Sequence, residues 1–377
     1  MKKVYIAYSK KPIKDAVEEL YNKLNEESAV DNSSIKLIVF FASSNYDTAE
    51  VNDFMNARFG HIKMIGCTTA GEISSGYMGS DSIVAMGLTS DIIQDLHIEV
   101  IENLDKSMPD CVPSAQKFND YFGLNLFNMS SKEYFGLVLI DGLSMMEETF
   151  LDAFGEFTNI LFTGGSSGDD LKFKETAIFT NGKYYKHSGL ICIIKAASQF
   201  GIERTQSFRK IGKTLKVTKA CTKNRIIYEL NGKPAADTYC EALGIKKEEL
   251  RNRLIVNPLG LMLSTFELPF VRSAARILDD GSFGMHCSVM EGTELEILES
   301  VNMIAETNKC IETIKNKYKN INGIIAFNCV LRYLEVQITN EVEEFGDVFK
   351  DIPTIGFCTY GEYYIGLVNQ TLTMLVF

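Results

Sequence analysis

Several features that mark other classes of protein are missing from this 377-residue chain. It has no tryptophan, only seven prolines, and no stretch that approaches the ~20 consecutive apolar residues of a membrane-spanning helix. It has no linker rich in Pro, Gly or Ser, so we expect its parts to pack together rather than to move as separated domains. The N-terminal apolar run is too short for a secretory signal peptide, and we expect it to form a first strand.

Clustered positive charge is also missing. The chain carries 38 Lys and Arg against 49 Asp and Glu, a formal net charge of −11. Surfaces for nucleic acids or anionic membranes need grouped Lys and Arg, whereas the lysine-rich stretches at residues 10–14 and 315–319 are typical of solvated helix edges. We therefore expect neither a nucleic acid nor a membrane as a partner.

The nine cysteines follow no disulfide or zinc pattern. They are odd in number and scattered, none forms C-x-x-C, and some lie in apolar runs, as Cys192 does in L-I-C-I-I. The sequence also lacks H-E-x-x-H and any Cys/His pair with zinc spacing, so we expect no metal site. Reduced thiols that behave as small hydrophobes indicate a cytoplasmic protein.

An internal repeat is the most informative feature that the sequence does contain. The segment I-G-C-T-T-A-G-E at residues 65–72 returns as I-G-F-C-T-Y-G-E at residues 355–362, with one Ile, two Gly, one Thr and one Glu at identical spacing. Before each copy an apolar run leads into a helical stretch. Residues 135–162 follow the same plan and run into T-G-G-S-S-G-D-D at residues 163–170. The sequence therefore predicts internally duplicated strand–helix–strand units.

These units predict an α/β fold of mixed sheets with flanking helices. We expect the helices at residues 47–59, 147–157 and 341–349, and another over residues 299–318. An apolar return follows each glycine-rich turn, which favours antiparallel strands beside the parallel ones. Asn181-Gly182 predicts a hairpin. A different, β-rich region begins near residue 215, so we expect two packed domains, 1–215 and 216–377.

Pieces spread over nearly the whole chain together resemble the FIST family, bacterial sensory modules with an N-terminal and a C-terminal FIST domain. They are the G-C-T-T-A-G-E turn, G-G-S-S-G-D-D with the hairpin I-F-T-N-G, L-N-G-K-P-A-A-D-T-Y at residues 230–239, L-P-F-V-R-S-A at 268–274, D-G-S-F with M-E-G-T ending at 293, F-N-C-V-L-R at 327–332, and G-F-C-T-Y-G-E-Y-Y-I-G-L-V-N-Q-T-L-T at 356–373. The resemblance implies small-ligand sensing, with amino acids proposed as ligands. It also implies coupling to a signalling output. Because the sequence ends four residues after the last matching piece, we expect that output to be a separate protein such as a kinase or cyclase.

Polar residues in and around the repeated turns are the expected contacts of a small polar ligand. Glycines let a ligand approach backbone N–H groups, and the hydroxyl and carboxylate side chains supply further hydrogen bonds. The expected contacts are Thr69, Glu72, Asp169, Thr359, Tyr360, Glu362 and Asn369. The alternative is structural: the glycines form tight turns while the carboxylates cap backbone groups.

Two arginines in apolar runs complete the expected site. Arg272 lies in L-P-F-V-R-S-A-A, and Arg332 follows a strand-like run. An arginine in such a run is uncommon unless it is paired, and its guanidinium suits a ligand carboxylate. For an amino-acid ligand, Arg272 binding the carboxylate and Glu362 binding the ammonium group is the simplest pair. An internal ion pair is the alternative for each arginine.

Other functions stay open beside a sensor without a resident cofactor. A non-covalent haem b sensor of nitric oxide would need His61, His97, His187, His286 or a cysteine as axial ligand. A cysteine-dependent enzyme would use Cys67 or Cys358, which lie in the repeated turns. We expect no enzyme, because Ser166-Ser167 has no identifiable histidine partner in the sequence and the G-G-S-S-G-D-D segment lacks the G-K-[ST] of a phosphate-binding loop.

Overall fold

The computed structural model describes residues 3–30, 34–106, 108–264, 268–364 and 366–377. The chain forms two compact units, one of Met1–Arg204, Cys310–Gly366 and Leu372–Phe377, the other of Thr205–Lys309 and Leu367–Thr371. Mixed sheets and helices confirm the α/β class. The predicted domains 1–215 and 216–377 follow chain order, whereas the compact units are discontinuous, because the third strand–helix–strand copy shares a sheet with the first.

Three strand–helix–strand copies build the first unit, as the repeat predicts. They are β2 (Ile35–Ser43), α2 (Thr48–Phe59) and β3 (Lys63–Thr69); β8 (Tyr134–Ile140), α4 (Glu147–Gly155) and β9 (Leu161–Ser166); and β22 (Ile324–Cys329), α8 (Val330–Ile338), α9 (Val342–Asp347) and β23 (Thr354–Thr359). The two strands of each copy pair in parallel. The return strands β6 (Ile83–Thr89), β12 (Gly189–Ala196) and β26 (Thr371–Val376) pair antiparallel with the first strand of their copy.

One helix of the third copy was not expected from the sequence. The prediction places a single helix at residues 341–349, whereas the structure has α8 directly after β22 and then the shorter α9. Val330, Tyr333 and Val336 are buried at helical spacing, which is the apolar face that α8 packs inward. This extra helix matters below because residues of α8, Val330 and Tyr333 among them, line a cavity.

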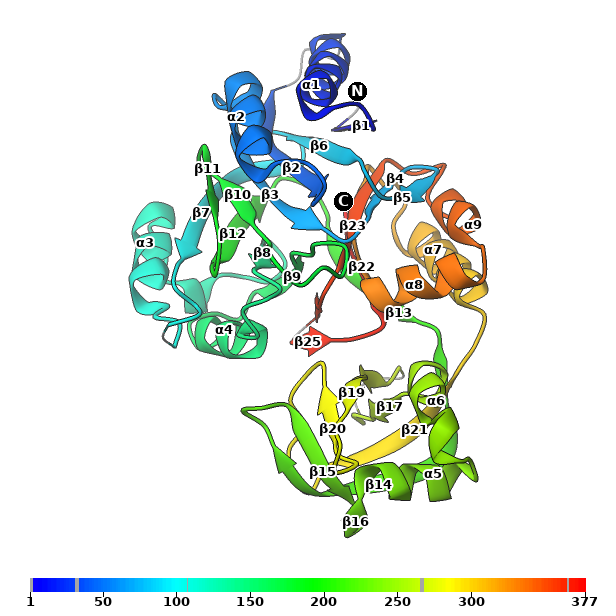
Figure 1. The fold of residues 1–377 in the computed structure, drawn as a ribbon. Helices are drawn as coiled ribbons and strands as arrows, with labels where there is room; N and C mark the ends of the chain where they lie inside the picture. The colour runs from blue at the N-terminus through cyan, green and yellow to red at the C-terminus, as the bar shows by residue number, and fades with distance from the viewer. Residues whose placement is uncertain (1–2, 31–33, 107, 265–267, 365) are drawn as a thin grey trace. The chain divides into compact units, whose positions relative to one another are not determined.

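The hairpins that follow the glycine-rich turns are exchanged between the copies. Strands β4 (Glu72–Ser74) and β5 (Tyr77–Gly79) of the first copy extend the sheet of the third. Strands β10 (Ile178–Thr180) and β11 (Lys183–Tyr185) of the second extend the sheet of the first, and β24 (Glu362–Tyr364) of the third extends the sheet of the second. Each copy therefore completes a neighbour's sheet, and the three fold as one body (Figure 1).

The three sheets share one central core. Within the first unit, their strand orders are β1-β6-β2-β3-β10-β11, β7-β12-β8-β9-β24 and β13-β26-β22-β23-β4-β5, with β1 (Val4–Ser9), β7 (Ile93–Ile101) and β13 (Gly201–Gln206) each at one edge. Val39, Leu137 and Phe327, one from each sheet, belong to this core. The neighbouring residue Phe40 faces the opposite way, into a second cluster beneath α1 (Ile13–Val30) and α2.

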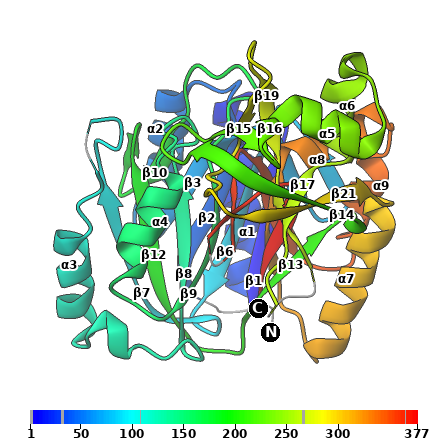
Figure 2. The same cartoon turned by 90° about the horizontal axis from the view of Figure 1, so that it is seen from below.

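Helices cover the outer faces of the sheets. Figure 1 shows α1 and α2 together on one side of the first unit, α3 (Val112–Phe122) with α4 on another, and α8 with α9 on a third. Figure 2 shows β7, β12 and β8 side by side next to α3 and α4. Burial on both faces explains why the strands read as continuous apolar runs. None of the helices in the described part of the chain combines the length and hydrophobicity needed to span a bilayer.

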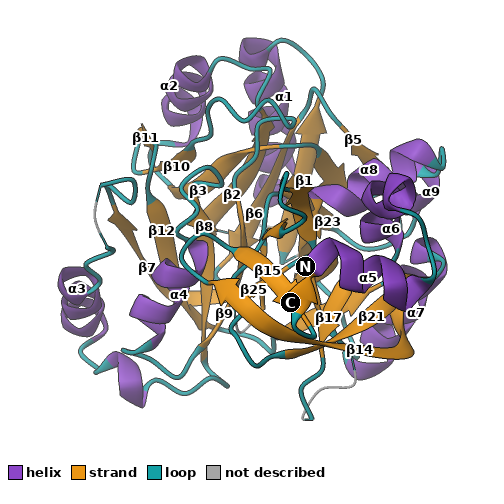
Figure 3. Cartoon of the chain, turned by 60° about the horizontal axis from the view of Figure 1, so that its bottom comes forward, coloured by secondary structure: helices purple, strands orange, loops and turns teal. Residues whose placement is uncertain are grey.

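The second unit is one antiparallel sheet with two short helices. Its strands are β14 (Phe208–Cys221), β15 (Ile226–Leu230), β16 (Lys233–Pro234), β17 (Leu259–Leu261), β18 (Phe270–Arg272), β19 (Ala274–Ile277), β20 (Phe283–Met285) and β21 (Glu294–Ser300), in the order β18-β17-β21-β14-β15-β20-β19 with β16 beside β15. Helices α5 (Ala235–Leu243) and α6 (Leu250–Val256) share its core, and Figure 3 shows α5 close to β14 and β15. The helix expected over residues 299–318 is α7 (Met303–Lys317). Asn302 precedes it, and its side-chain oxygen accepts a hydrogen bond from Ala305 N in the first turn.

Candidate functional site

Three turns meet where the second strand of each copy ends. They comprise residues 69–72 after β3, 166–169 after β9 and 359–362 after β23, and we call them the three glycine turns. The turns read T-A-G-E, S-S-G-D and T-Y-G-E in chain order. All three therefore have a hydroxyl residue in the first position, a glycine in the third and an acidic residue in the fourth. This third match was not predicted from the sequence, although Ser166, Gly168 and Asp169 have the same spacing as the matching residues of the other two turns.

Backbone hydrogen bonds tie the glycine turns into a ring. Gly168 N donates to Thr68 O at 3.0 Å, Ala70 N donates to Cys358 O at 3.1 Å, and Tyr360 N donates to Ser166 O at 3.3 Å. Each turn thus bonds to another, and the circuit passes through all three copies. This arrangement places the acids of the turns at the carboxyl ends of the strands, where open α/β sheets bind ligands.

The first glycine turn is closed and internally bonded. Thr69 and Glu72 are both 0% exposed, and the Thr69 hydroxyl donates to one Glu72 carboxylate oxygen. The other oxygen accepts from Ser82 N at 3.1 Å and from Ser82 Oγ at 2.6 Å. Gly71 has φ +132°, and a side chain there would put Cβ 2.8 Å from the Tyr333 ring, so only glycine fits.

Burial changes the acidity of Glu72. Loss of solvation raises the pKa of its carboxyl from 4.5 to about 8, against the opposing effect of the hydrogen bonds from Ser82 and Thr69. A carboxyl with that pKa is mostly protonated at neutral pH. It can then donate to Thr69 Oγ1, whose own hydroxyl donates a hydrogen bond to the carbonyl oxygen of Ala42 at 3.2 Å.

The third glycine turn is equally enclosed, with one exception. Thr359 and Glu362 are 0% exposed, and Thr359 Oγ1 lies 2.7 Å from Ser166 O and 2.8 Å from Gly361 O. Tyr360 is half-buried and stacks on Phe173, with 5.2 Å between the ring centroids. Burial raises the pKa of the Tyr360 hydroxyl, which therefore stays protonated and donates to Asp169 Oδ1 at 2.5 Å.

Asp169, in the second glycine turn, organises the segment that follows it. Its Oδ1 accepts from Phe173 N at 2.9 Å, and its Oδ2 accepts from Lys174 N at 2.6 Å and Glu175 N at 3.0 Å. Tyr360 bonds to the same carboxylate. One buried side chain thus fixes residues 169–175, which we call the loop of the second copy.

That loop holds an unusual concentration of strained backbone. Asp170, Leu171 and Phe173 have φ values of +55°, +61° and +50°, in the left-handed region that side chains rarely occupy. Such residues persist where surrounding bonds hold them, and they gather at ligand-binding segments. The bonds here are those of Asp169 and the contact of Tyr360 Oη with Leu171 N at 2.7 Å.

The remaining expected site residues lie elsewhere. Arg332 is buried on α8, where its Nε donates to Asn328 Oδ1 at 2.9 Å, its guanidinium lies over the Phe345 ring, and burial lowers its pKa. Arg272, on β18, and Asn369 belong to the second unit, whereas Glu362 belongs to the first. The ligand-binding roles of these residues, including the pair Arg272–Glu362, therefore stay predictions.

A cavity of about 490 Å³, the first cavity, opens beside the glycine turns in the first unit. The segment after β2 and the start of α2 form one wall, and the loop of the second copy forms another. Its polar lining residues include Ser44, Asn45, Thr68, Asp169, Lys172, Lys174 and Glu175. Of the expected site residues, only Asp169 is among them.

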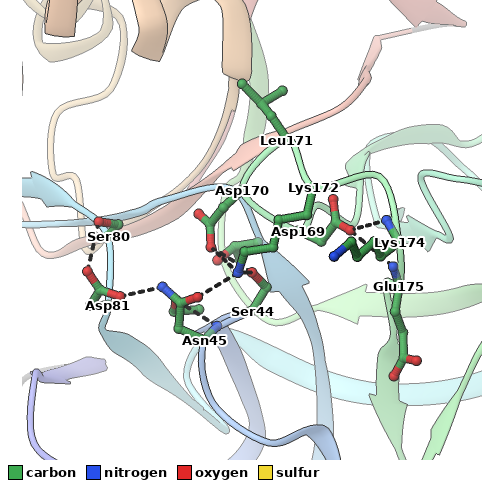
Figure 4. A network of polar contacts seen from close by, with 12 residues as sticks. Ser44, Asn45, Ser80, Asp81, Asp169, Asp170, Leu171, Lys172, Lys174 and Glu175 are labelled. Atoms are coloured by element: carbon green, nitrogen blue, oxygen red, sulfur yellow. Dashed lines mark hydrogen bonds and ion pairs between the residues drawn. The ribbon is translucent and has the colours of Figure 1, made fainter.

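A polar network closes one side of the first cavity (Figure 4). Ser44 Oγ donates to Asp170 Oδ2 at 2.6 Å, and Lys172 Nζ donates to Asn45 Oδ1 at 2.6 Å. Asn45 Nδ2 in turn donates to Asp81 Oδ1 at 2.5 Å. Sequence reasoning missed these residues, although Ser44 and Asn45 directly follow a strand and Lys172 follows the G-G-S-S-G-D-D segment.

The cysteines of the turns are poorly suited to nucleophilic chemistry. Cys67 and Cys358 are both 0% exposed, and burial raises the pKa of each thiol well above its usual value. The thiolate is the nucleophilic form, so neither residue is activated. Among the described residues, no group of three or more His, Cys, Asp or Glu side chains is placed to hold a metal ion.

Solved structures offer little overlap with this fold. Phosphoribosylformylglycinamidine synthase II from Thermotoga maritima matches with a TM-score of 0.23 at 8% identity, covering 99% of this chain and 71% of that protein. A PurLQS structure from the same organism gives a TM-score of 0.22 at 8% identity, with the same coverage. Likeness this low carries no argument.

Sequence comparison is decisive. The chain is 23% identical over 390 residues to the uncharacterized protein MJ1623 of Methanocaldococcus jannaschii, a match that covers 94% of this chain and 73% of the relative. The model of the FIST N domain matches residues 36–233, and that of the FIST C domain matches residues 235–364. These domains are sensory modules of signal transduction. The chain belongs to the FIST family.

Proposed function

We propose that this protein senses an amino acid or a related polar metabolite, which binds in the first cavity. The observation that carries the proposal is a 490 Å³ cavity at the carboxyl ends of β2 and β3 that presents both signs of charge. Lys172 and Lys174 lie on the loop of the second copy, and so does Glu175. A zwitterion needs partners of both signs, and this one loop supplies them.

The first cavity suits a ligand carboxylate at one end and an ammonium group at the other. Lys172 Nζ donates to neutral oxygens of Asn45 and Ser44 and lies 3.7 Å from Asp170 Oδ2, so a ligand carboxylate would exchange two neutral partners and one long ion pair for a closer ion pair. Lys174 is exposed and lines the same space. Glu175, whose exposed side chain forms an ion pair with Lys186 at 2.9 Å, is the acceptor for the ligand ammonium.

Ligand binding would be transmitted through the loop of the second copy. This loop is held by few side chains and carries strained backbone. A ligand that bonds Lys172 and Lys174 would therefore bind one conformation of the loop more tightly than another and shift the protein towards it. We infer that a kinase or cyclase reads this change. All nine cysteines lie in the described part of the chain and none of them forms a disulfide, which agrees with a cytoplasmic setting.

A thermal-shift screen of amino acids with titration calorimetry tests this proposal. A ligand at 100 times its dissociation constant adds about 2.7 kcal/mol of stability, which for a chain of this size raises Tm by a few degrees. The variant Lys174→Gln, without one cation of the first cavity, is expected to bind the amino acid at least tenfold more weakly. Lys132→Gln, at an exposed position outside the first cavity, is the control and keeps wild-type affinity. Equal affinity in both variants would remove the first cavity as the site.

A further inference from the structure

A second cavity of about 310 Å³ lies on the other side of the polar network, also within the first unit. It is lined by Asn45, Ala70, Ser80, Asp170 and Leu171, and by one face of α8. The α8 residues are Val330, Tyr333, Leu334 and Gln337, at the spacing of one helix face. Nothing in the proposed function uses this space.

The second cavity occupies the position in the repeat that the first cavity occupies. The first cavity lies between the segment that leaves β2 and residues that follow the glycine turn of the second copy. The second lies between the helix that leaves β22 and residues that follow the glycine turn of the first copy, among them Ser80. In each case a copy's first strand leads into one wall, and residues that follow a neighbouring copy's glycine turn form another; Asp170 and Leu171 of the second copy also line the second cavity.

The chemistry of the second cavity differs from that of the first. Its lining residues include the carboxylate of Asp170 but no Lys, Arg or His, whereas Lys172 and Lys174 line the first cavity. Tyr333 and Leu334 add an apolar surface, and Gln337 adds an amide. The Asp170 carboxylate, which lies 3.7 Å from Lys172 Nζ, is the charged group of this lining, and beside apolar side chains it favours a cation with an apolar group over a carboxylate.

The polar network separates the two cavities. Ser44 bonds to Asp170 and Asn45 bonds to Lys172, so these two contacts cross from the segment after β2 to the loop of the second copy. Asn45 lines both cavities, and Lys172 and Asp170 line one each. Lys172 Nζ also lies 3.7 Å from Asp170 Oδ2, so the charged groups of the loop meet within the network that separates the two cavities (Figure 4).

We propose that the second cavity is a second ligand site, which binds a small primary amine with an apolar group. The ammonium group bonds to Asp170, and the apolar group packs on Tyr333 and Leu334. The site is separate from the amino-acid site in the first cavity but coupled to it, because Lys172 Nζ lies 3.7 Å from Asp170 Oδ2 and the amine competes with this ion pair. Two different ligands would then bind against the same loop.

Titration calorimetry of the intact chain with 2-phenylethylamine tests the second site. The amine is expected to bind with one-to-one stoichiometry, and 2-phenylethanol and 3-phenylpropanoate, which lack the positive charge, at least tenfold more weakly. Asp170→Asn keeps the acceptor for Ser44 and suits the positive φ, so the fold is expected to persist while amine affinity falls at least tenfold. Leu334→Trp fills the cavity and should abolish binding.

Glu175→Gln is the matched control, because it removes a carboxylate from the first cavity only. It should bind the amine within twofold of the wild type. Loss of amine binding in Glu175→Gln with retention in Asp170→Asn would place the amine in the first cavity and overturn the second site. The absence of saturable amine binding to folded wild-type protein would also overturn it. Amino-acid binding is measured with the same protein preparations and with Lys174→Gln. Failure of the proposed amino-acid site can then be distinguished from failure of the amine site.

Discussion

Replacing Asp169 by alanine is expected to lower the free energy of unfolding by about 3–4 kcal/mol and to abolish ligand binding in the first cavity. The substitution leaves the N–H groups of Phe173, Lys174 and Glu175 without their acceptor and removes the partner of Tyr360 Oη. Three residues of the loop lie at positive φ and depend on these bonds. Denaturant unfolding measures the stability, and calorimetry with an amino acid that binds the wild type measures the affinity.

Hydrogen exchange distinguishes loss of the loop from general destabilisation. In Asp169→Ala the amides of residues 173–175 should exchange at least 100-fold faster, while strands β2 and β8 keep their order of protection. Tyr360→Phe is the graded control, because it removes the hydroxyl that bonds the carboxylate and the N–H groups of Asp169 and Leu171, and it leaves the three backbone bonds to the carboxylate intact. It should cost about 2 kcal/mol, less than Asp169→Ala. Wild-type affinity in Asp169→Ala would contradict the role of this loop as a cavity wall.

The repeated architecture could be predicted from the sequence because its signals are local. Apolar runs such as β2 and β22 are buried on both faces, and each is followed by helix-forming residues and a glycine-rich turn. The exchange of hairpins could not be predicted, because the pairing of Gly66 with Phe179 or of Glu72 with Phe357 joins segments far apart in sequence. Turn chemistry shows that a hairpin forms, but not which sheet it joins.

The site was harder to predict than the fold for a physical reason. A motif that recurs at structurally equivalent places can be required by the fold rather than by a ligand. In the ring of turns, each copy has a glycine, a hydroxyl residue and a buried acid at the same positions. Thr69, Glu72 and Thr359 bond within the ring, as the structural alternative described. The residues that line the first cavity, such as Ser44 and Lys172, belong to segments in which the copies differ.

The second copy illustrates how a structural acid can contribute to a site. In the first and third copies the acid lies on the exchanged strand, where Glu72 pairs with Phe357 and Glu362 with Gly165. In the second copy β10 begins only at Ile178, so a longer segment follows Asp169. Asp169 caps that segment, and the segment forms the wall of the first cavity. The difference between the copies therefore predicts the cavity better than their similarity does.

Glu72 is expected to make the stability of the protein fall as pH rises from about 5 to 8. Its folded pKa of about 8 lies above the ordinary value of 4.5, so in this interval the folded state keeps a proton that the unfolded state has released. Stability is therefore complete below about pH 4.5 and is lost as pH rises through 8. At about 1.4 kcal/mol per pH unit, this group contributes on the order of 3–5 kcal/mol. Denaturant unfolding at a series of pH values measures the change.

Glu72→Gln isolates this effect, because an amide reproduces the protonated carboxyl: its oxygen accepts from Ser82, and its NH₂ group donates to Thr69. The variant should match the wild type near pH 5 and exceed its stability at pH 8, which removes this part of the pH dependence. Ser82→Ala acts in the opposite direction, since it takes one donor from the ionised form and should lower stability most at high pH. If Glu72→Gln keeps the wild-type slope, Glu72 is ionised in the folded protein, and its three bonds outweigh its burial.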